Sequence, residues 1–159
     1  MDSCVDYENA LFVCTVGAST TRKKIIQYIK SLGVKSFATL IDPDAILSGR
    51  VKVGEGSIIC AHTIITVDVT IGEHTILNLD CTVGHDAVLH DFVTLYPSVN
   101  VSGITELGEC VEMGTGSQII QGKKIGEDTI IGAGSVVVKD IPANCTAVGV
   151  PAVPIKYHS

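Results

Sequence analysis

The sequence contains no tryptophan, and only seven of its 159 residues are phenylalanine or tyrosine. This low number of aromatic side chains fits a narrow protein interior that is filled by isoleucine, valine and leucine. The chain also lacks a secretory signal peptide and any run of 20 apolar residues. These two absences argue against a secreted protein and against a membrane-spanning helix.

Basic residues are also scarce, since 11 lysines and arginines stand against 17 acidic residues, for a net charge of −6. An acidic chain of this kind argues against a nucleic-acid partner. The six cysteines include no CxxC pair, a usage that fits a reducing compartment better than a disulfide framework. We therefore expect a cytoplasmic protein that binds neither nucleic acid nor membrane.

What the sequence does contain, over residues 41–142, is a six-residue pattern repeated seventeen times without insertion. Counted from Ile41, the first position is aliphatic in all seventeen units, and the fifth is small or β-branched in all but the unit with Lys123. This period fits neither an α-helix nor an alternating strand. It indicates one short strand and one turn per unit, with the aliphatic residue pointing inward. The second position is often glycine, which we expect to relieve the turn (Gly54, Gly72, Gly84, Gly108, Gly114, Gly126 and Gly132).

Three such units close one triangular coil of eighteen residues, and successive coils stack as parallel strands. At a strand spacing of about 4.8 Å, five to six coils form a prism roughly 25 Å tall. The predicted fold class is therefore mainly β, a parallel β-helix of hexapeptide repeats with a small N-terminal β-α-β piece. The expected domains are residues 1–40, 41–142 and a C-terminal tail, 143–159.

The N-terminal piece reads as a strand at Leu11–Val16, a helix from about Thr21 to Leu32 and a second strand at Val34–Leu40. Ser19 or Thr20 is the candidate N-cap of the helix. We expect this piece to cover the open end of the prism, where strand edges would otherwise be unpaired.

The N-terminus of this helix could bind a phosphate, because Gly17 precedes it and Arg22 and Lys23 lie nearby. A solvated basic face made by Arg22, Lys23 and Lys24 explains the same residues equally well. Both interpretations stay open at this point.

Five histidines are present, of which His158 lies in the tail. His62 and His74 occupy fourth positions on different faces, so a surface role is expected for both. His85 instead falls at a turn and is followed by Asp86. One imidazole nitrogen can then face a substrate while the carboxylate holds the other, an arrangement suited to a general base.

Residues eighteen apart stack directly, so Gly103, Gln121 and Lys139 lie above His85. The bare glycine leaves room for a ligand, and its N–H could stabilise the oxyanion of an acyl group. A second edge carries mostly small residues along which a long ligand could lie, with Asn78 below them (Pro97, Thr115, Ala133 and Pro151). The two edges lie at different corners, and a symmetric trimer would bring one corner of each subunit near the other corner of its neighbour.

Several motifs occur together in this chain: Val16-Gly17 with Arg22-Lys23-Lys24-Ile25, Ile41-Asp42-Pro43-Asp44-Ala45, Val83-Gly84-His85-Asp86 shortly after Asn78, Ile131-Gly132-Ala133-Gly134-Ser135-Val136-Val137, Lys139-Asp140 and Gly149-Val150-Pro151-Ala152. With them, the chain from Phe12 onward resembles the hexapeptide acyltransferases. The most similar group is the sialic acid O-acetyltransferases and bacterial amino-sugar-nucleotide N-acetyltransferases (NeuD/PglD-like).

The resemblance implies a left-handed β-helix, a homotrimer and acetyl-CoA as donor, with clefts between subunits and no metal. It implies that His85 is the general base, assisted by Asp86, and that Asn78 lies near the acceptor. It also implies that Gly103, Thr115 and Ala133 contact the thioester and the pantetheine arm of CoA.

Two departures from the family pattern affect these expectations. The family usually begins with a Gly-rich strand-turn-helix that holds the nucleotide of a sugar nucleotide, and this chain starts too late to include it. Gly17 and Arg22 are the candidate substrate-binding residues of the N-terminal piece. Thr94 stands where some relatives place a second histidine in the CoA site. The expected activity is acetyl transfer to an amine or hydroxyl of a sugar or sugar nucleotide.

Two alternatives come from other functional classes. The spacing of His85 and His90 resembles the metal pair of γ-class carbonic anhydrases, which need three histidines shared across subunits. With its short N-terminal piece, the chain would also suit a non-catalytic hexapeptide-repeat protein.

Overall fold

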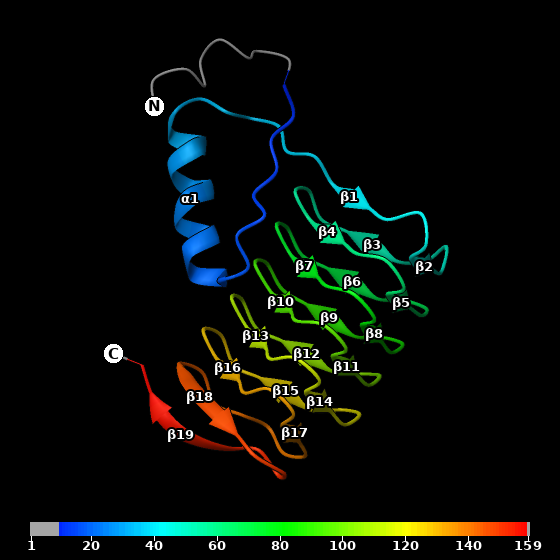
Figure 1. The fold of residues 1–159 in the computed structure, drawn as a ribbon, viewed down its shortest axis with the longest axis vertical. Helices are drawn as coiled ribbons and strands as arrows, with labels where there is room; N and C mark the ends of the chain where they lie inside the picture. Colours follow the sequence, from blue (N-terminus) through cyan, green and yellow to red (C-terminus); the bar gives the residue numbers. More distant parts are fainter. Residues whose placement is uncertain (1–9, 159) are drawn as a thin grey trace.

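The computed structural model describes residues 10–158, and in this range the chain forms a triangular prism of parallel strands with one helix beside it (Figure 1). Seventeen strands have two residues each, and two longer strands follow them. The elements are α1 (Ser19–Ser31), β1 (Leu40–Ile41), β2 (Ile46–Leu47), β3 (Lys52–Val53), β4 (Ile58–Ile59), β5 (Ile64–Ile65), β6 (Thr70–Ile71), β7 (Ile76–Leu77), β8 (Thr82–Val83), β9 (Val88–Leu89), β10 (Thr94–Leu95), β11 (Asn100–Val101), β12 (Glu106–Leu107), β13 (Glu112–Met113), β14 (Gln118–Ile119), β15 (Lys124–Ile125), β16 (Ile130–Ile131), β17 (Val136–Val137), β18 (Cys145–Val148) and β19 (Val153–Tyr157).

The strands form three sheets, one on each face of the prism. The first runs β1-β4-β7-β10-β13-β16-β18-β19, the second β17-β14-β11-β8-β5-β2 and the third β15-β12-β9-β6-β3. Among β1–β17 the pairing is parallel and joins residues eighteen apart, as when Leu95 lies between Leu77 and Met113. The predicted β-helix of hexapeptide repeats and its eighteen-residue coil are therefore confirmed.

The interior holds the first and fifth positions of the hexads. Leu77, Leu95 and Met113 are fully buried at first positions. Hydroxyl residues at fifth positions are buried too, and most of them donate to a main-chain carbonyl, as Thr63 Oγ1 does to Asn78 O at 2.8 Å. Such a narrow core tolerates polar residues because their hydrogen bonds are made locally.

The glycines at second positions have a different role from the one expected. Positive φ angles fall at the fourth position of the hexads, for example at Asp80 (φ 58°) and Asp86 (φ 57°). The second-position glycine is needed because the next coil passes very close to it. A β-carbon on Gly54 would lie 2.5 Å from the carbonyl carbon of Gly72, and one on Gly114 would lie 2.6 Å from Ala133 N.

The N-terminal β-α-β piece is reduced to α1 and a single parallel bridge between Phe12 and Phe37. The helix begins at Ser19 after Ala18, and no side chain among residues 10–158 caps it, so the prediction of Ser19 or Thr20 as N-cap was wrong. Gly33 follows the helix with φ of +95°, a conformation that glycine adopts without a steric penalty at a helix end. With 13 residues, α1 is too short to cross a bilayer, and no other helix lies in residues 10–158.

Residues 10–38, which we call the N-terminal unit, pack along the side of the prism (Figure 1). The sequence had instead predicted that this piece covers the open end. A second apolar cluster joins Ile26 and Phe37 of this unit to Phe92 and Cys110 of the prism. None of residues 10–158 covers the first coil, and Ile46 there is 62% exposed.

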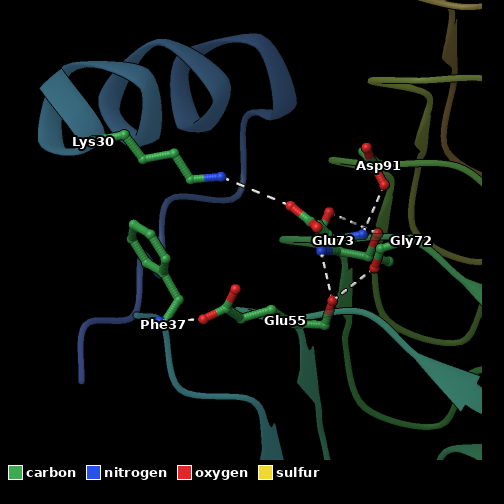
Figure 2. Close-up of polar contacts among 8 residues, drawn as sticks. Lys30, Phe37, Glu55, Gly72, Glu73 and Asp91 are labelled. Atoms are coloured by element: carbon green, nitrogen blue, oxygen red, sulfur yellow. Dashed lines mark hydrogen bonds and ion pairs between the residues drawn. The ribbon is translucent and has the colours of Figure 1, made fainter. Parts of the chain in front are cut away.

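Acidic residues of one corner hold the unit in place. Lys30 Nζ lies 3.7 Å from Glu73 Oε2, and Phe37 N donates to Glu55 Oε1 at 2.7 Å (Figure 2). Lys23 Nζ is bonded to Glu109 Oε2 at 2.9 Å further along the same corner.

The C-terminal residues are more ordered than a tail. Strand β18 pairs with β16 at a separation of sixteen residues, and β19 returns antiparallel to it. Because this last coil is two residues shorter, Ala133 aligns with Gly149, and the expected stacking of Pro151 on Ala133 was wrong.

Candidate active site

His85 and Asp86 form a hydrogen-bonded pair in the turn between β8 and β9. His85 Nδ1 lies 2.8 Å from Asp86 Oδ2, and both side chains are about half exposed. Asp86 occupies the left-handed fourth position of its hexad, a conformation that aspartate tolerates better than most residues. The carboxylate thus engages Nδ1 and leaves Nε2 of the imidazole for proton exchange with a ligand.

Gly103 lies directly against this imidazole, as the eighteen-residue arithmetic predicted. Ile104 N donates to His85 O at 2.7 Å, which ties the two coils together. A β-carbon on Gly103 would come within 2.6 Å of His85 Nε2. The histidine ring itself therefore uses the space that the glycine leaves, and no acceptor among residues 10–158 is bonded to Gly103 N–H.

Thr115 and Ala133 lie on the corner at the other border of the same sheet, β17-β14-β11-β8-β5-β2. Both residues are exposed, and Gly134 N donates to Thr115 O at 2.9 Å, so they are stacked as expected. Within one chain this corner and the His85 corner thus flank a single face of the prism.

Asn78 lies lower on the Thr115 corner. It aligns with Tyr96, one position from Pro97, because Leu77 pairs with Leu95. Its Nδ2 donates to Leu95 O at 2.8 Å, which orients the side-chain amide. In the half-buried Asn78 side chain, Oδ1 has no donor among the described residues.

Arg22 is neither a solvated residue nor placed to bind a phosphate. Its side chain is completely buried, and burial lowers the pKa of the guanidinium. We therefore leave Arg22 out of the acceptor site. The guanidinium donates to five main-chain carbonyls and one hydroxyl at 2.7–3.2 Å: Val16 O, Gly17 O, His74 O, Phe92 O, Val93 O and Thr94 Oγ1.

Thr94 is likewise a structural residue, and its expected place in the CoA site was wrong. Its side chain is fully buried, and Oγ1 donates to Gly17 O at 2.7 Å while accepting from Arg22. The threonine lies under the N-terminal unit, out of reach of a ligand on the surface.

The N-terminus of α1 is already bonded to a carboxylate of the same chain, that of Glu112. Ser19 N donates to Glu112 Oε1 at 2.7 Å, and Tyr96 Oη donates to Glu112 Oε2 at 3.2 Å. Burial and the charge of Glu112 raise the pKa of Tyr96. Gly17 is half-buried beside the Tyr96 ring, so the phosphate site predicted here is occupied by a carboxylate that the sequence did not single out.

His90 lies on a different face, where its Nε2 is 3.1 Å from Glu106 Oε1. Glu106 also binds Lys124 Nζ at 2.7 Å, and these two bonds lower its pKa. The three residues line an open cavity of about 520 Å³. His85 and His90 are thus engaged by different carboxylates, and residues 10–158 contain no group of three potential metal ligands within the chain.

The two remaining prism histidines differ from each other. His62 is exposed, as expected. His74 is 1% exposed and lies between the rings of Phe37 and Phe92, so its predicted surface role was wrong. The docked N-terminal unit covers this turn, which the repeat pattern alone could not indicate.

Comparison with known proteins places these features in context. A perosamine N-acetyltransferase variant from Caulobacter crescentus, solved with CoA and GDP-perosamine, superposes with a TM-score of 0.92 and is 32% identical. The match covers 98% of this chain and 73% of that one. The acetyltransferase domain of PglB from Neisseria gonorrhoeae, solved with acetyl coenzyme A, gives a TM-score of 0.85 and 34% identity over 91% and 70% of the two chains.

Among curated proteins, a 2,3,4,5-tetrahydropyridine-2,6-dicarboxylate N-acetyltransferase from Clostridium perfringens is 36% identical over 136 residues, or 80% of this chain and 58% of the relative. The chain spans less than three fifths of the length of the curated relatives it matches. No family model matches the sequence.

Proposed function

Since this chain belongs to the hexapeptide-repeat acetyltransferases of the NeuD/PglD type, with their left-handed parallel β-helix, we propose that it acetylates an amine or hydroxyl of a sugar or sugar nucleotide. Acetyl-CoA is the proposed donor. The observation that carries the proposal is the hydrogen-bonded His85–Asp86 pair, whose imidazole packs against Gly103. A perosamine N-acetyltransferase shares the fold over 98% of this chain.

The proposed reaction is direct transfer. The acceptor nitrogen or oxygen attacks the thioester carbonyl carbon while Nε2 of His85 takes its proton. The C–S bond then breaks, and the proton on His85 passes to the departing CoA thiolate. Asp86 holds Nδ1 during both proton transfers, and Gly103 N–H is the proposed donor to the oxyanion.

The support for the donor site is the exposed edge of Thr115 and Ala133. Their small side chains leave room for a pantetheine arm along this edge, and the solved relatives named above were crystallised with CoA or acetyl coenzyme A. Because this edge and His85 lie at different corners of one chain, a homotrimer would complete each site by joining corners of neighbouring subunits.

For the acceptor, we propose an amino sugar linked to a nucleotide. The relatives that match over most of this chain include a perosamine N-acetyltransferase solved with GDP-perosamine, and two of those structures are of variants in which one histidine is replaced. Asn78, whose Oδ1 has no donor among the described residues, is the proposed contact. The five cysteines described are all free, which supports a reducing, cytoplasmic setting as part of the proposal.

The experiment is a CoA-release assay with acetyl-CoA and a panel of nucleotide-linked amino sugars, free amino sugars, simple amines and sugar alcohols. Acceptor-dependent CoA release, with the acetylated product seen by mass spectrometry, is expected for a nucleotide-linked amino sugar. Absence of turnover across the panel, together with no binding of acetyl-CoA by calorimetry, would overturn the proposal in favour of a non-catalytic protein.

A further inference from the structure

His74 is an unusual residue for its place in the repeat. It occupies a fourth hexad position in the left-handed conformation (φ 52°), a position at which another corner of the prism carries exposed residues such as His62 and Asp80. Its ring is nevertheless 1% exposed. It stacks on Phe92 at a centroid distance of 5.2 Å and meets Phe37 edge-on at 4.8 Å.

Neither ring nitrogen of His74 has a hydrogen-bond partner among residues 10–158. A neutral imidazole buried in this way leaves one N–H donor unpaired, and an imidazolium would leave two donors and a charge. Burial without hydrogen-bond partners therefore tolerates the neutral ring and strongly disfavours the cation.

The charged groups around His74 do not offset this penalty. Lys30 and Arg22 of α1 face it with positive charge, and Glu73 and Glu55 face it from the prism. Both carboxylates are already engaged, Glu73 by Lys30 at 3.7 Å and Glu55 by Phe37 N at 2.7 Å (Figure 2). Burial, the largest influence, lowers the pKa of His74.

This ring lies where the N-terminal unit meets the prism. Phe37 comes from the segment that follows α1, whereas Phe92 belongs to a prism turn. The main chain of His74 takes part as well, because its carbonyl accepts a hydrogen bond from Arg22 Nε at 2.8 Å. Any movement of the His74 ring therefore disturbs the contact on which the unit depends.

We propose that His74 is a proton-sensitive latch: its neutral ring keeps the N-terminal unit docked on the prism, and its protonation releases the unit. In the released state the imidazole is hydrated and takes up a proton with an ordinary pKa near 6.5. The docked state binds that proton less readily, so docking is strongest above this pH and weakens as pH falls below it. One proton changes the docking equilibrium by at most about tenfold per pH unit.

The test is amide hydrogen exchange of α1 between pH 8 and pH 5, corrected for intrinsic exchange rates. The amides of β11 and β14, in the sheet between the His85 and Thr115 corners, serve as the internal reference in the same sample. An undocked helix of 13 residues is marginal in water, so its amides exchange when the unit is released. Protection of α1 is expected to fall several-fold below pH 6.5 while the prism strands stay protected.

His74→Phe is the informative variant, since Phe92 shows that phenylalanine is accepted at this turn position with φ of 60°. It should lose most of the pH dependence of α1 protection. His62→Phe, at an exposed position of the same geometry, is the matched control and should keep it. If His74→Phe does not fold, His74→Gln supplies the same comparison.

The proposal is overturned by a wild-type α1 whose protection is constant from pH 8 to pH 5. It is equally overturned if the neutral variants keep the wild-type pH dependence, or if prism amides lose protection in parallel with α1. None of these readouts depends on acetyl transfer, so failure of the latch and failure of the proposed enzyme activity are distinguishable.

Discussion

The imidazole of His85 packs against Gly103 of the next coil, so that a β-carbon on the glycine would lie 2.6 Å from Nε2. The two residues are eighteen positions apart and occupy the same corner of successive coils. The position of the proposed general base is therefore defined by the absence of a side chain on the coil above it.

Gly103→Ala should accordingly displace the His85 ring and lower kcat. Misplacing a catalytic group by about 1 Å costs on the order of 10²-fold. Steady-state kinetics with the preferred acceptor measure this loss, and the unfolding midpoint shows whether the prism is intact. Gly49→Ala, where an added β-carbon meets nothing within 4 Å, is the control. Equal kcat values for Gly103→Ala and Gly49→Ala would contradict the proposed role of the glycine.

Ala133→Tyr should block the proposed path of the pantetheine arm. The residue is exposed on an edge of small side chains, so the larger ring should weaken acetyl-CoA binding at least tenfold without unfolding the prism. Calorimetric titration with CoA measures the effect, with Val153→Tyr on exposed β19 as control. Unchanged CoA affinity in Ala133→Tyr would place the donor on another edge.

The protein should be a trimer in solution. Three chains of 16.7 kDa give a particle of about 50 kDa by light scattering at micromolar concentration. The expectation follows from the proposed site, whose two parts lie at different corners of one chain. A mass near that of one chain would remove the proposed clefts between subunits.

Arg22→Met should loosen the N-terminal unit. The substitution leaves main-chain carbonyls of the unit and of the prism without their buried donor, which we expect to cost at least about 3 kcal/mol of docking free energy. Hydrogen exchange of α1 measures the loss. Lys24→Met removes an exposed charge from the same helix and should be nearly neutral. Similar exchange in the two variants would show that the Arg22 network does not hold the unit.

The repeat pattern predicted much of this molecule because a hexad dictates both strand and stacking. Aliphatic residues at every sixth position define the buried columns, and adding eighteen to His85 leads directly to Gly103. The same arithmetic brings Thr115 and Ala133 together. The close approach at Gly54 was not apparent, since the distance between coils is a property of the folded prism.

The errors in the candidate site concern residues at the contact between the N-terminal unit and the prism. Arg22, Thr94 and His74 each belong to an element whose period or composition suggests exposure, yet all three are buried where the unit docks. No periodicity relates residues 10–38 to the prism. One signal was nevertheless readable, because acidic residues recur every eighteen positions at the corner that receives the unit (Glu55, Glu73, Asp91, Glu109 and Glu127).

The most direct test of the account compares His85→Ala with wild type in the acetyl-transfer assay, alongside CoA titration. The account predicts that His85→Ala loses about 10² to 10⁴-fold in turnover with little change in CoA affinity, because only general-base catalysis is removed. Asp86→Asn should lose less, and His90→Ala should be nearly silent. Wild-type turnover in His85→Ala, or an equal loss in His90→Ala accompanied by bound zinc, would contradict it.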